Sequence, residues 1–264
     1  MKPKATAAVL CGGRGERMRP LTDYFQKTMV PVGPSKRPLL EYIIRLLSFH
    51  GLSQITLLTG YRTHEIRDYF RNGSDFGVEI RYSEDMEGQR GSLNALSNAL
   101  AEGAIADSDV LLIYYGDVLS DLNITELLAS HAKHGNDATL VLSKGYSLPV
   151  GVADVKGGHV TAVREKPSLD LNVTTGCMTL GPKAMKLVEK IAGGDKTDLM
   201  THFVPSLLAN DGRLGAYFLK GRWYDVGSVT SFEKLNSDLR HWSLPFLTSN
   251  FPDKRAASKD RPRG

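Results

Sequence analysis

Short apolar runs alternate with amphipathic segments along the first half of the chain. The runs at residues 5–10, 55–58 and 110–115 are continuous, as in strands that are buried on both faces. Residues 39–47 instead carry apolar side chains at helical spacing, and Gly51 supplies a stop. The same reasoning predicts strands at 78–82 and 138–142 and helices at 65–71, 93–100 and 125–134, the last opened by a capping box of Asn123 and Glu126. This β-α-β alternation favours a parallel sheet with helices on both faces.

The second half of the chain is more mixed. Residues 149–155 and 158–163 form a predicted hairpin around Lys156 and Gly157. Further strands are expected at 173–180 and 215–219, and helices at 183–191, 197–208 and 230–239. We therefore predict an α/β fold, Rossmann-like, with a mostly parallel sheet flanked by helices and a mixed-strand half. One domain is expected to cover residues 1–245, with a basic, flexible tail at 246–264.

The loop after the first strand gives the clearest chemical signal. It reads LCGGRGERMRP over residues 10–20, with glycine at positions 12, 13 and 15. Glycines let the backbone approach a ligand, and successive backbone N–H groups can form an anion site. The three arginines of the loop add fixed positive charge suited to phosphate oxygens. We interpret the loop as a polyphosphate site at the carboxyl end of a strand, where open α/β sheets bind ligands.

Two common phosphate motifs do not fit this loop. A Walker loop needs Gly-x4-Gly-Lys-Ser/Thr, and the dinucleotide fingerprint needs a third glycine where this chain has Met18. The pattern Gly-Gly-x-Gly-x-Arg-Met-x-Pro-Leu-Thr, followed by KTMVPV at residues 27–32, instead resembles the sugar-1-phosphate nucleotidylyltransferases. The resemblance runs from about residue 5 to about residue 239.

This resemblance implies roles for residues in and near the loop. Lys27 is expected to bridge phosphates of the two substrates, and Arg17 to hold the outgoing pyrophosphate. The expected nucleotide-binding residues are Leu10, Gly12, Gly13, Gly15, Arg17, Glu84 and Gly91. The attacking phosphate is already largely ionised near neutrality, because its second pKa is about 6. No general base is therefore needed, and positioning and electrostatic stabilisation should dominate catalysis.

Two aspartates are the candidate metal ligands. Asp117 follows the very apolar strand at 110–115, where a carboxylate can hold a hard cation through oxygen. The resemblance implies that Asp117 and Asp225, the latter in WYDVG at 223–227, together bind Mg²⁺. Lys27, Arg17 and Asp117 are then the expected catalytic residues. Because 108 positions separate the two aspartates, their pairing depends on the resemblance alone.

A second group of residues is assigned to the sugar phosphate. Glu165-Lys166-Pro167 resembles the Glu-Lys-Pro of the family, in which the glutamate binds sugar hydroxyls and the lysine faces the phosphate. Gly151 and Thr175 fall where the family contacts the sugar, although these matches are short. Outside this context, a Glu-Lys pair is usually a surface charge pair.

The identity of the base stays open. Relatives often carry Gly-Thr-Ala-Gly-Ala or Gly-Leu-Ala-Gln-Ala in the segment that binds the base, whereas this chain reads GSLNA at 91–95, after Arg90. The segment 115–117 and the helix after it also resemble glucose-1-phosphate cytidylyltransferases, but the longer insertion of those enzymes is absent. GTP, UTP or dTTP is therefore favoured over CTP, and neither the sugar nor the pathway is indicated.

Composition limits the remaining possibilities. The chain has 264 residues, 41% of them hydrophobic, and no apolar stretch approaches the roughly 20 residues that span a bilayer. The net charge of +4 lies mostly in residues 250–264, which carry five basic and two acidic side chains, so no specific nucleic-acid partner is expected. Two cysteines are too few for a disulfide framework, and both are expected to pack as apolar residues. We expect a cytoplasmic protein with no membrane span.

These observations predict a Mg²⁺-dependent transfer from a nucleoside triphosphate to a sugar 1-phosphate, giving an NDP-sugar and pyrophosphate by in-line displacement. Two alternatives stay open: transfer to a non-sugar phosphate such as phosphocholine, and a non-catalytic regulatory subunit that binds nucleotide sugars. Lys27, Asp117 and Asp225 argue against the second, because a degenerate subunit does not need all three. A homo-oligomer is expected only by analogy with the family.

Overall fold

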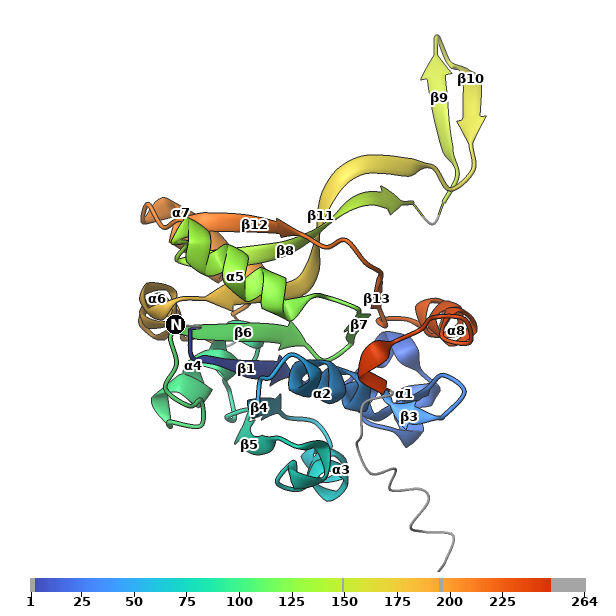
Figure 1. Ribbon diagram of the computed structural model, residues 1–264. Helices are drawn as coiled ribbons and strands as arrows, with labels where there is room; N and C mark the ends of the chain where they lie inside the picture. The colour runs from blue at the N-terminus through green and yellow to red at the C-terminus, as the bar shows by residue number, and fades with distance from the viewer. Residues whose placement is uncertain (1–2, 149, 195–196, 248–264) are drawn as a thin grey trace, which may run out of the picture.

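The computed structural model describes residues 3–148, 150–194 and 197–247. Its centre is a seven-stranded sheet with the strand order β12-β8-β11-β6-β1-β4-β5 (Figure 1). The strands are β1 (Ala5–Leu10), β4 (Gln54–Thr59), β5 (Glu79–Glu84), β6 (Val110–Tyr115), β8 (Ala138–Ser147), β11 (Ser168–Leu180) and β12 (Leu214–Phe218). Neighbouring strands are parallel except at β11, which runs antiparallel to both β6 and β8. The predicted mostly parallel sheet is confirmed.

Helices cover both faces of the sheet, as predicted. Successive residues of a strand point to opposite faces, and β1 shows this directly: Ala7 and Val9 belong to one core cluster and Ala8 to the other. The first cluster contains residues of α2, α3, α5 and α8, and the second contains residues of α4, α6 and α7. The helices are α1 (Leu21–Tyr24), α2 (Leu39–Phe49), α3 (Thr63–Phe70), α4 (Ser92–Ala101), α5 (Ile124–His134), α6 (Pro182–Ile191), α7 (Val204–Ala209) and α8 (Val229–Asp238).

Smaller elements surround the sheet. Three two-stranded ribbons are formed by β2 (Pro31–Val32) with β3 (Arg37–Pro38), β7 (Val118–Ser120) with β13 (Trp223–Asp225), and β9 (Val152–Lys156) with β10 (His159–Arg164). The last ribbon is the predicted hairpin, of which Pro149 lies outside the described residues. Short 3-10 helices are η1 (Glu16–Met18), η2 (Lys27–Met29), η3 (Ser74–Phe76) and η5 (Pro245–Leu247).

The helix predicted at 197–208 is wrong as a single element. The structure has a π-helix, η4 (Leu199–Phe203), which continues directly into α7. Pro205 lies in the first turn of α7 and has no N–H, so an unbroken α-helical ladder cannot run through it. The capping box at Asn123 is present in part: its side chain accepts from the Glu126 N–H at 3.1 Å, but the Glu126 carboxylate bonds the Asn123 side chain at 3.0 Å rather than its backbone.

Two further features concern the end of the chain and the cysteines. Phe246 is buried in the first core cluster, so ordered packing extends through η5, and the rest of the predicted tail, 248–264, lies outside the described residues. Cys11 and Cys177 are both buried free thiols, as predicted, and burial raises the pKa of each well above its ordinary value. Within the described ranges, no helix is both long and apolar enough to cross a membrane.

Candidate active site

The glycine-rich loop leaves the sheet at the carboxyl end of β1 and is tied to both neighbouring strands. The Gly116 N–H, just after β6, donates to the Leu10 carbonyl at 2.9 Å, and the Cys11 N–H donates to Leu58 of β4 at 2.7 Å. Because β1, β4, β5 and β6 are parallel, the segments that follow them gather at one edge of the sheet. The predicted loop therefore lies at the edge of the sheet where open α/β folds bind their ligands.

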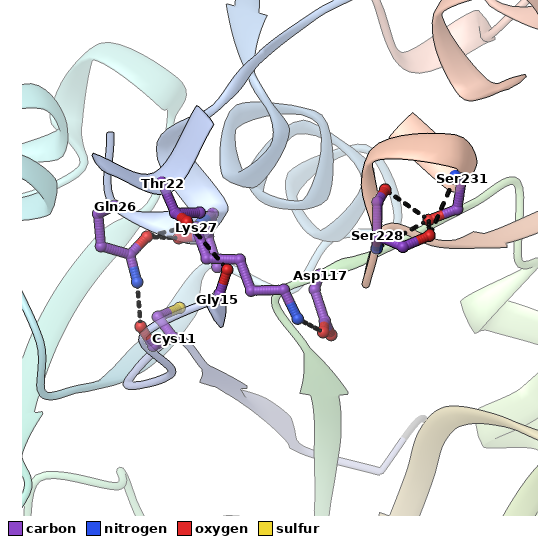
Figure 2. Close-up of polar contacts among 9 residues, drawn as sticks. Cys11, Gly15, Thr22, Gln26, Lys27, Asp117, Ser228 and Ser231 are labelled. Atoms are coloured by element: carbon purple, nitrogen blue, oxygen red, sulfur yellow. Dashed lines mark hydrogen bonds and ion pairs between the residues drawn. The ribbon is translucent and has the colours of Figure 1, made fainter. Parts of the chain in front are cut away.

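One glycine of the loop has a conformation that other residues resist. Gly15 has a φ of +69°, and a Cβ built on it would lie 2.8 Å from the Thr22 methyl and 3.0 Å from Lys27 Cβ. The Thr22 hydroxyl donates to the Gly15 carbonyl at 2.9 Å (Figure 2). The missing side chain thus lets the loop and Lys27 approach each other closely.

Gln26 fixes the position of Lys27, a role that its sequence context does not indicate. Its fully buried side chain donates to the Cys11 carbonyl at 2.5 Å and accepts from the Thr28 N–H at 2.6 Å (Figure 2). The Gln26 N–H donates to a Glu65 carboxylate oxygen at 2.7 Å. The amide therefore connects the phosphate loop to η2, the turn that carries Lys27.

The structure brings Lys27 and Asp117 into contact. Lys27 Nζ forms an ion pair with Asp117 Oδ2, and the side chains are 13% and 23% exposed (Figure 2). Asp117 follows the Gly116 turn, in which a Cβ would lie 2.7 Å from the Leu10 carbonyl oxygen. Only glycine fits that turn, so the aspartate is held close to the loop.

Asp225 is brought to Asp117 by strand pairing. In the β7–β13 ribbon Asp225 faces Val118, and the Val226 N–H donates to the Asp117 carbonyl at 2.8 Å. Desolvation within the site, and then the negative charge of Asp117, raise the pKa of the Asp225 carboxyl, while Lys27 and Arg17 act in the opposite direction. The two predicted metal ligands are therefore electrostatic neighbours.

Arg17 belongs to the same group. A Cβ built on Gly227 would lie 2.9 Å from Asp225 Oδ1 and 3.2 Å from an Arg17 guanidinium nitrogen. Directly after Gly227, the Ser228 and Ser231 side chains form a capping box that begins α8 (Figure 2). Lys27, Arg17, Asp117 and Asp225 thus converge from four separate segments.

The nucleotide side of the site includes a residue that the sequence analysis passed over. Glu84, the predicted residue, is exposed and forms an ion pair with Arg67 at 2.8 Å. Asp85 instead turns toward the loop, since a Cβ on Gly12 would lie 2.7 Å from its Oδ2 and one on Gly60 only 2.3 Å. Desolvation raises the pKa of this carboxyl. Its place after β5, next to glycines that follow β1 and β4, could have identified it.

The close approach of Thr197 leaves no room for a side chain at Gly91. It precedes α4 with a φ of +102°, and a Cβ there would lie 1.9 Å from the Thr197 carbonyl oxygen. Asn94, which is buried, accepts from the Thr197 hydroxyl at 2.7 Å and donates to the Arg90 carbonyl at 3.0 Å. The segment predicted to bind the base is therefore joined by hydrogen bonds to Gly193, Gly194 and Thr197, and its contact with a nucleotide stays a prediction.

Three of the four predicted sugar-phosphate residues form a separate group, Gly151, Glu165 and Lys166. Gly151 and Glu165 are adjacent, since a Cβ on Gly151 would lie 3.0 Å from Glu165 Oε2, and Lys166 follows with a φ of +44°. They lie at the base of the β9–β10 hairpin, which stands away from the main sheet (Figure 1). Thr175 is buried in β11 and donates to the Val141 carbonyl at 3.0 Å. Thr175 is nearer the Lys27–Asp117 pair, since a Cβ on the next residue, Gly176, would lie 3.1 Å from Val118, which follows Asp117.

Comparison with known proteins gives a consistent picture. The nucleotidyl transferase family model matches residues 6–241. A UTP–glucose-1-phosphate uridylyltransferase of Synechocystis is 29% identical over 86% of this chain, and this chain spans 61% of that relative's length. A mannose-1-phosphate guanylyltransferase of Mycobacterium tuberculosis is 28% identical over 88% of this chain and 64% of its own length.

Solved structures share the fold. A crystal structure of a putative glucose-1-phosphate thymidylyltransferase of Bacillus anthracis, in complex with a sucrose, has a TM-score of 0.72 and 21% identity, covering 90% of this chain and 96% of its own. HddC of Yersinia pseudotuberculosis, complexed with GMP-PN, has a TM-score of 0.68 and 20% identity, covering 89% of this chain and 99% of its own. At these identities the likeness concerns the fold.

Proposed function

The chain belongs to the nucleotidyl transferase family, and we propose that it transfers a nucleotidyl group from a nucleoside triphosphate to a sugar 1-phosphate. The observation that supports this most strongly is the gathering of Lys27, Arg17, Asp117 and Asp225 beside the glycine-rich loop. The uridylyl- and guanylyltransferase relatives act on sugar 1-phosphates by name, which favours that class of acceptor.

The proposed reaction is a displacement at the α-phosphorus. An oxygen of the sugar phosphate attacks this phosphorus and forms a new P–O bond, while the bond to the oxygen bridging to the β-phosphate breaks and pyrophosphate leaves. Lys27 would neutralise charge that develops on the transferring phosphate, and Arg17 would hold the leaving pyrophosphate. Gln26 would keep Lys27 at a fixed distance from the loop, so that little reorganisation is needed during the reaction.

The carboxylates suit a hard divalent cation. Asp225 of β13 and Asp117, directly before its partner strand β7, supply oxygen donors. Desolvation, and after it the negative charge of Asp117, raise the pKa of Asp225, and a bound cation would offset that repulsion. We propose that these two residues hold Mg²⁺, which supplies charge neutralisation for the phosphates when bound. With the metal bound, the Asp117 carboxylate would contact both the metal and Lys27, instead of Lys27 alone.

Asp85 bears on the identity of the nucleotide base. Asp85 faces Gly12 and is a carboxylate that accepts hydrogen bonds only, so it suits a base edge that presents N–H donors. Guanine presents two adjacent donors on its Watson–Crick edge, which favours GTP within the set left open by the sequence. The cytoplasmic location expected from the sequence stays a prediction.

Pyrophosphate release with Mg²⁺, measured over a grid of nucleoside triphosphates and sugar 1-phosphates, tests the proposal. We expect at least one productive combination, with the NDP-sugar identified by mass spectrometry. Lys27→Ala should abolish that signal, and Lys183→Ala is the matched control, because Lys183 is a surface residue of α6 with an 81% exposed side chain. A folded protein that is silent with sugar phosphates but turns over with phosphocholine would overturn the sugar assignment. Silence with every acceptor would favour a binding subunit.

A further inference from the structure

The strand that carries Asp225 is too short to fix its own position. β13 has three residues and pairs with the three residues of β7 in a two-stranded ribbon. A ribbon of two strands is at best marginally stable in water without further packing. Contacts from outside the ribbon must therefore hold Asp225 in the place that the proposed reaction needs.

Tyr224, directly before Asp225, makes two such contacts. Successive side chains of a strand point to opposite faces, so Tyr224 and Asp225 lie on opposite faces of β13. The Tyr224 hydroxyl donates to Asp238 Oδ2. The Tyr224 ring lies 5.5 Å from the Trp242 ring, centroid to centroid, at an angle of 51°. A carboxylate and an aromatic ring thus hold the strand from the face that Asp225 does not use.

The carboxylate of Asp238 reaches Tyr224 from the end of α8. This helix begins just after the Asp225 segment, lies beside β13 (Figure 1), and ends at Asp238, 14 positions after Tyr224. The helix dipole disfavours a negative charge in the last turn. The hydrogen bond from Tyr224 gives this aspartate a donor that offsets the unfavourable position. The chain is therefore closed around Asp225 by a contact between the residue before it and the helix after it.

Asp121 fixes the entrance to β13. Its Oδ1 accepts from the Arg222 N–H at 2.7 Å, and its Oδ2 accepts from the Trp242 Nε1–H at 3.2 Å. A Cβ on Gly221 would lie 1.7 Å from Asp121 Oδ1, so only glycine fits there. Trp242 is buried. One carboxylate therefore connects the residue that precedes the strand to the ring that packs on Tyr224.

The helix α8 is also joined to the segment that carries Lys27. The Gly33 N–H, directly after β2, donates to Asn236 Oδ1 at 2.7 Å. Gly33 has a φ of +70°, and a Cβ on it would lie 3.2 Å from Leu239 Cδ1. Because η2, which carries Lys27, and β2 are consecutive elements, α8 relates the position of Asp225 to that of Lys27.

We propose that Tyr224 is a positioning residue, which holds the Asp225 carboxylate in place for the divalent cation through its hydrogen bond to Asp238. This role rests on the proposed function, in which Asp117 and Asp225 hold Mg²⁺. A carboxylate that is already held in place loses less conformational freedom when it binds a cation, so the site binds the metal more tightly. Loss of the Tyr224 hydroxyl should therefore weaken metal binding while both ligands remain present.

Binding of Mn²⁺ to the full chain, followed by the EPR signal of the free ion, tests this role without turnover. Mn²⁺ prefers the same oxygen ligands as Mg²⁺. Tyr224→Phe keeps the ring that packs on Trp242 and removes only the hydroxyl, so the Kd for Mn²⁺ should rise about tenfold. Asp238→Ala should raise the Kd as much. The double variant should raise it no further, because the two groups act through one hydrogen bond.

Tyr217→Phe is the matched control. The Tyr217 hydroxyl also donates to a carboxylate, Glu126 Oε2 at 3.2 Å, but Tyr217 lies in β12, an edge strand of the main sheet. Its loss should leave the Kd for Mn²⁺ at the wild-type value. Urea unfolding of both variants completes the comparison, since a merely structural tyrosine changes the free energy of unfolding and not the Kd for the metal.

Asp225→Asn separates the positioning role from the metal assignment. It removes a ligand oxygen, so it should raise the Kd for Mn²⁺ more than Tyr224→Phe does. A Kd that rises in Asp225→Asn but stays unchanged in Tyr224→Phe overturns the positioning role and leaves the metal site intact. A wild type that binds no Mn²⁺, or a Kd that is unchanged in both variants, overturns the metal site and the positioning role together.

Discussion

Lys27 Nζ and Asp117 Oδ2 form an ion pair although 90 positions separate the two residues in sequence. Lys27 comes from η2 and Asp117 from the turn after β6, and each is held by a close backbone approach at a glycine, Gly15 or Gly116. Because both side chains are mostly shielded from solvent, their charges act over short distances with little screening. The pair therefore lies at the centre of the proposed site.

Removal of the Lys27 charge should affect the chemical step most. We expect Lys27→Ala to lower kcat by about 10²- to 10³-fold, because the stabilisation it provides is largest in the transition state. Steady-state kinetics with the productive substrate pair measure this, with Lys183→Ala as control. A kcat for Lys27→Ala within about twofold of wild type would exclude Lys27 from the transition state.

The aspartates should control the metal requirement. Asp117→Asn and Asp225→Asn each remove one anionic oxygen ligand, so the Mg²⁺ concentration for half-maximal activity should rise at least about tenfold. The control is Asp211→Asn, in a surface turn where a positive φ of +52° suits asparagine. A Mg²⁺ titration of activity gives the result, and unchanged Mg²⁺ dependence in both variants would contradict the metal assignment.

Gln26 should matter for both stability and rate. Gln26→Ala leaves the Cys11 carbonyl and the Thr28 N–H without their buried partner, which should lower the free energy of unfolding by about 1–3 kcal/mol. Because the same amide positions Lys27, kcat should also fall, while the KM for the acceptor changes little. Urea unfolding and steady-state kinetics check the two effects. A loss of stability with unchanged kcat would limit Gln26 to a structural role.

The sequence predicts the position of the glycine-rich loop and of Asp117, but it does not predict the pairing of Asp117 with Asp225. The loop of residues 10–20 and Asp117 follow continuous apolar strands, and parallel strands bring such ends together. The pairing of Asp225 with Asp117 depends on β7 and β13, two three-residue strands that carry almost no sequence signal of their own. Local patterns cannot predict contacts of this kind, because tertiary packing decides them.

Asp85 and Gln26 were missed for different reasons. Asp85 is one of several acidic residues in the exposed segment after β5, and only its closeness to Gly12 and Gly60 distinguishes it from Glu84. Gln26 precedes the recognisable lysine motif and reads as an ordinary polar loop residue. Its complete burial and its hydrogen bonds appear only once the loop has folded over it.

Asp85 should influence the choice of nucleotide. Asp85→Asn replaces a carboxylate, which only accepts hydrogen bonds, by an amide, which both accepts and donates them. The KM for the preferred triphosphate should therefore rise about tenfold or more, and the KM for the other triphosphates should change less. Glu84→Gln is the matched control at the adjacent position. KM values for four triphosphates in both variants give the comparison. An equal effect of the two substitutions on all triphosphates would show that Asp85 does not read the base.

His131 should make stability depend on pH. Its ring is buried and bonds the Thr139 and Thr179 hydroxyls at 2.9 and 3.0 Å, and burial lowers its pKa below the ordinary 6.5. The unfolded chain therefore takes up a proton at higher pH than the folded chain. The contribution of this neutral histidine is present above pH 6.5 and is lost as pH falls through the lowered pKa. Unfolding free energies from pH 8 to 5 should fall less steeply in His131→Gln than in the wild type, and equal slopes would contradict the assignment.

The fate of a labelled α-phosphate shows which phosphorus of the triphosphate is transferred to the sugar phosphate. The wild type is incubated with Mg²⁺, a sugar 1-phosphate and a triphosphate labelled at either the α- or the γ-phosphorus. Transfer at the α-phosphorus predicts that the α label appears in an NDP-sugar and the γ label in pyrophosphate, and that both products are absent with Lys27→Ala. Release of the γ label as inorganic phosphate would exclude transfer at the α-phosphorus, and full transfer by Lys27→Ala would exclude a catalytic role of Lys27.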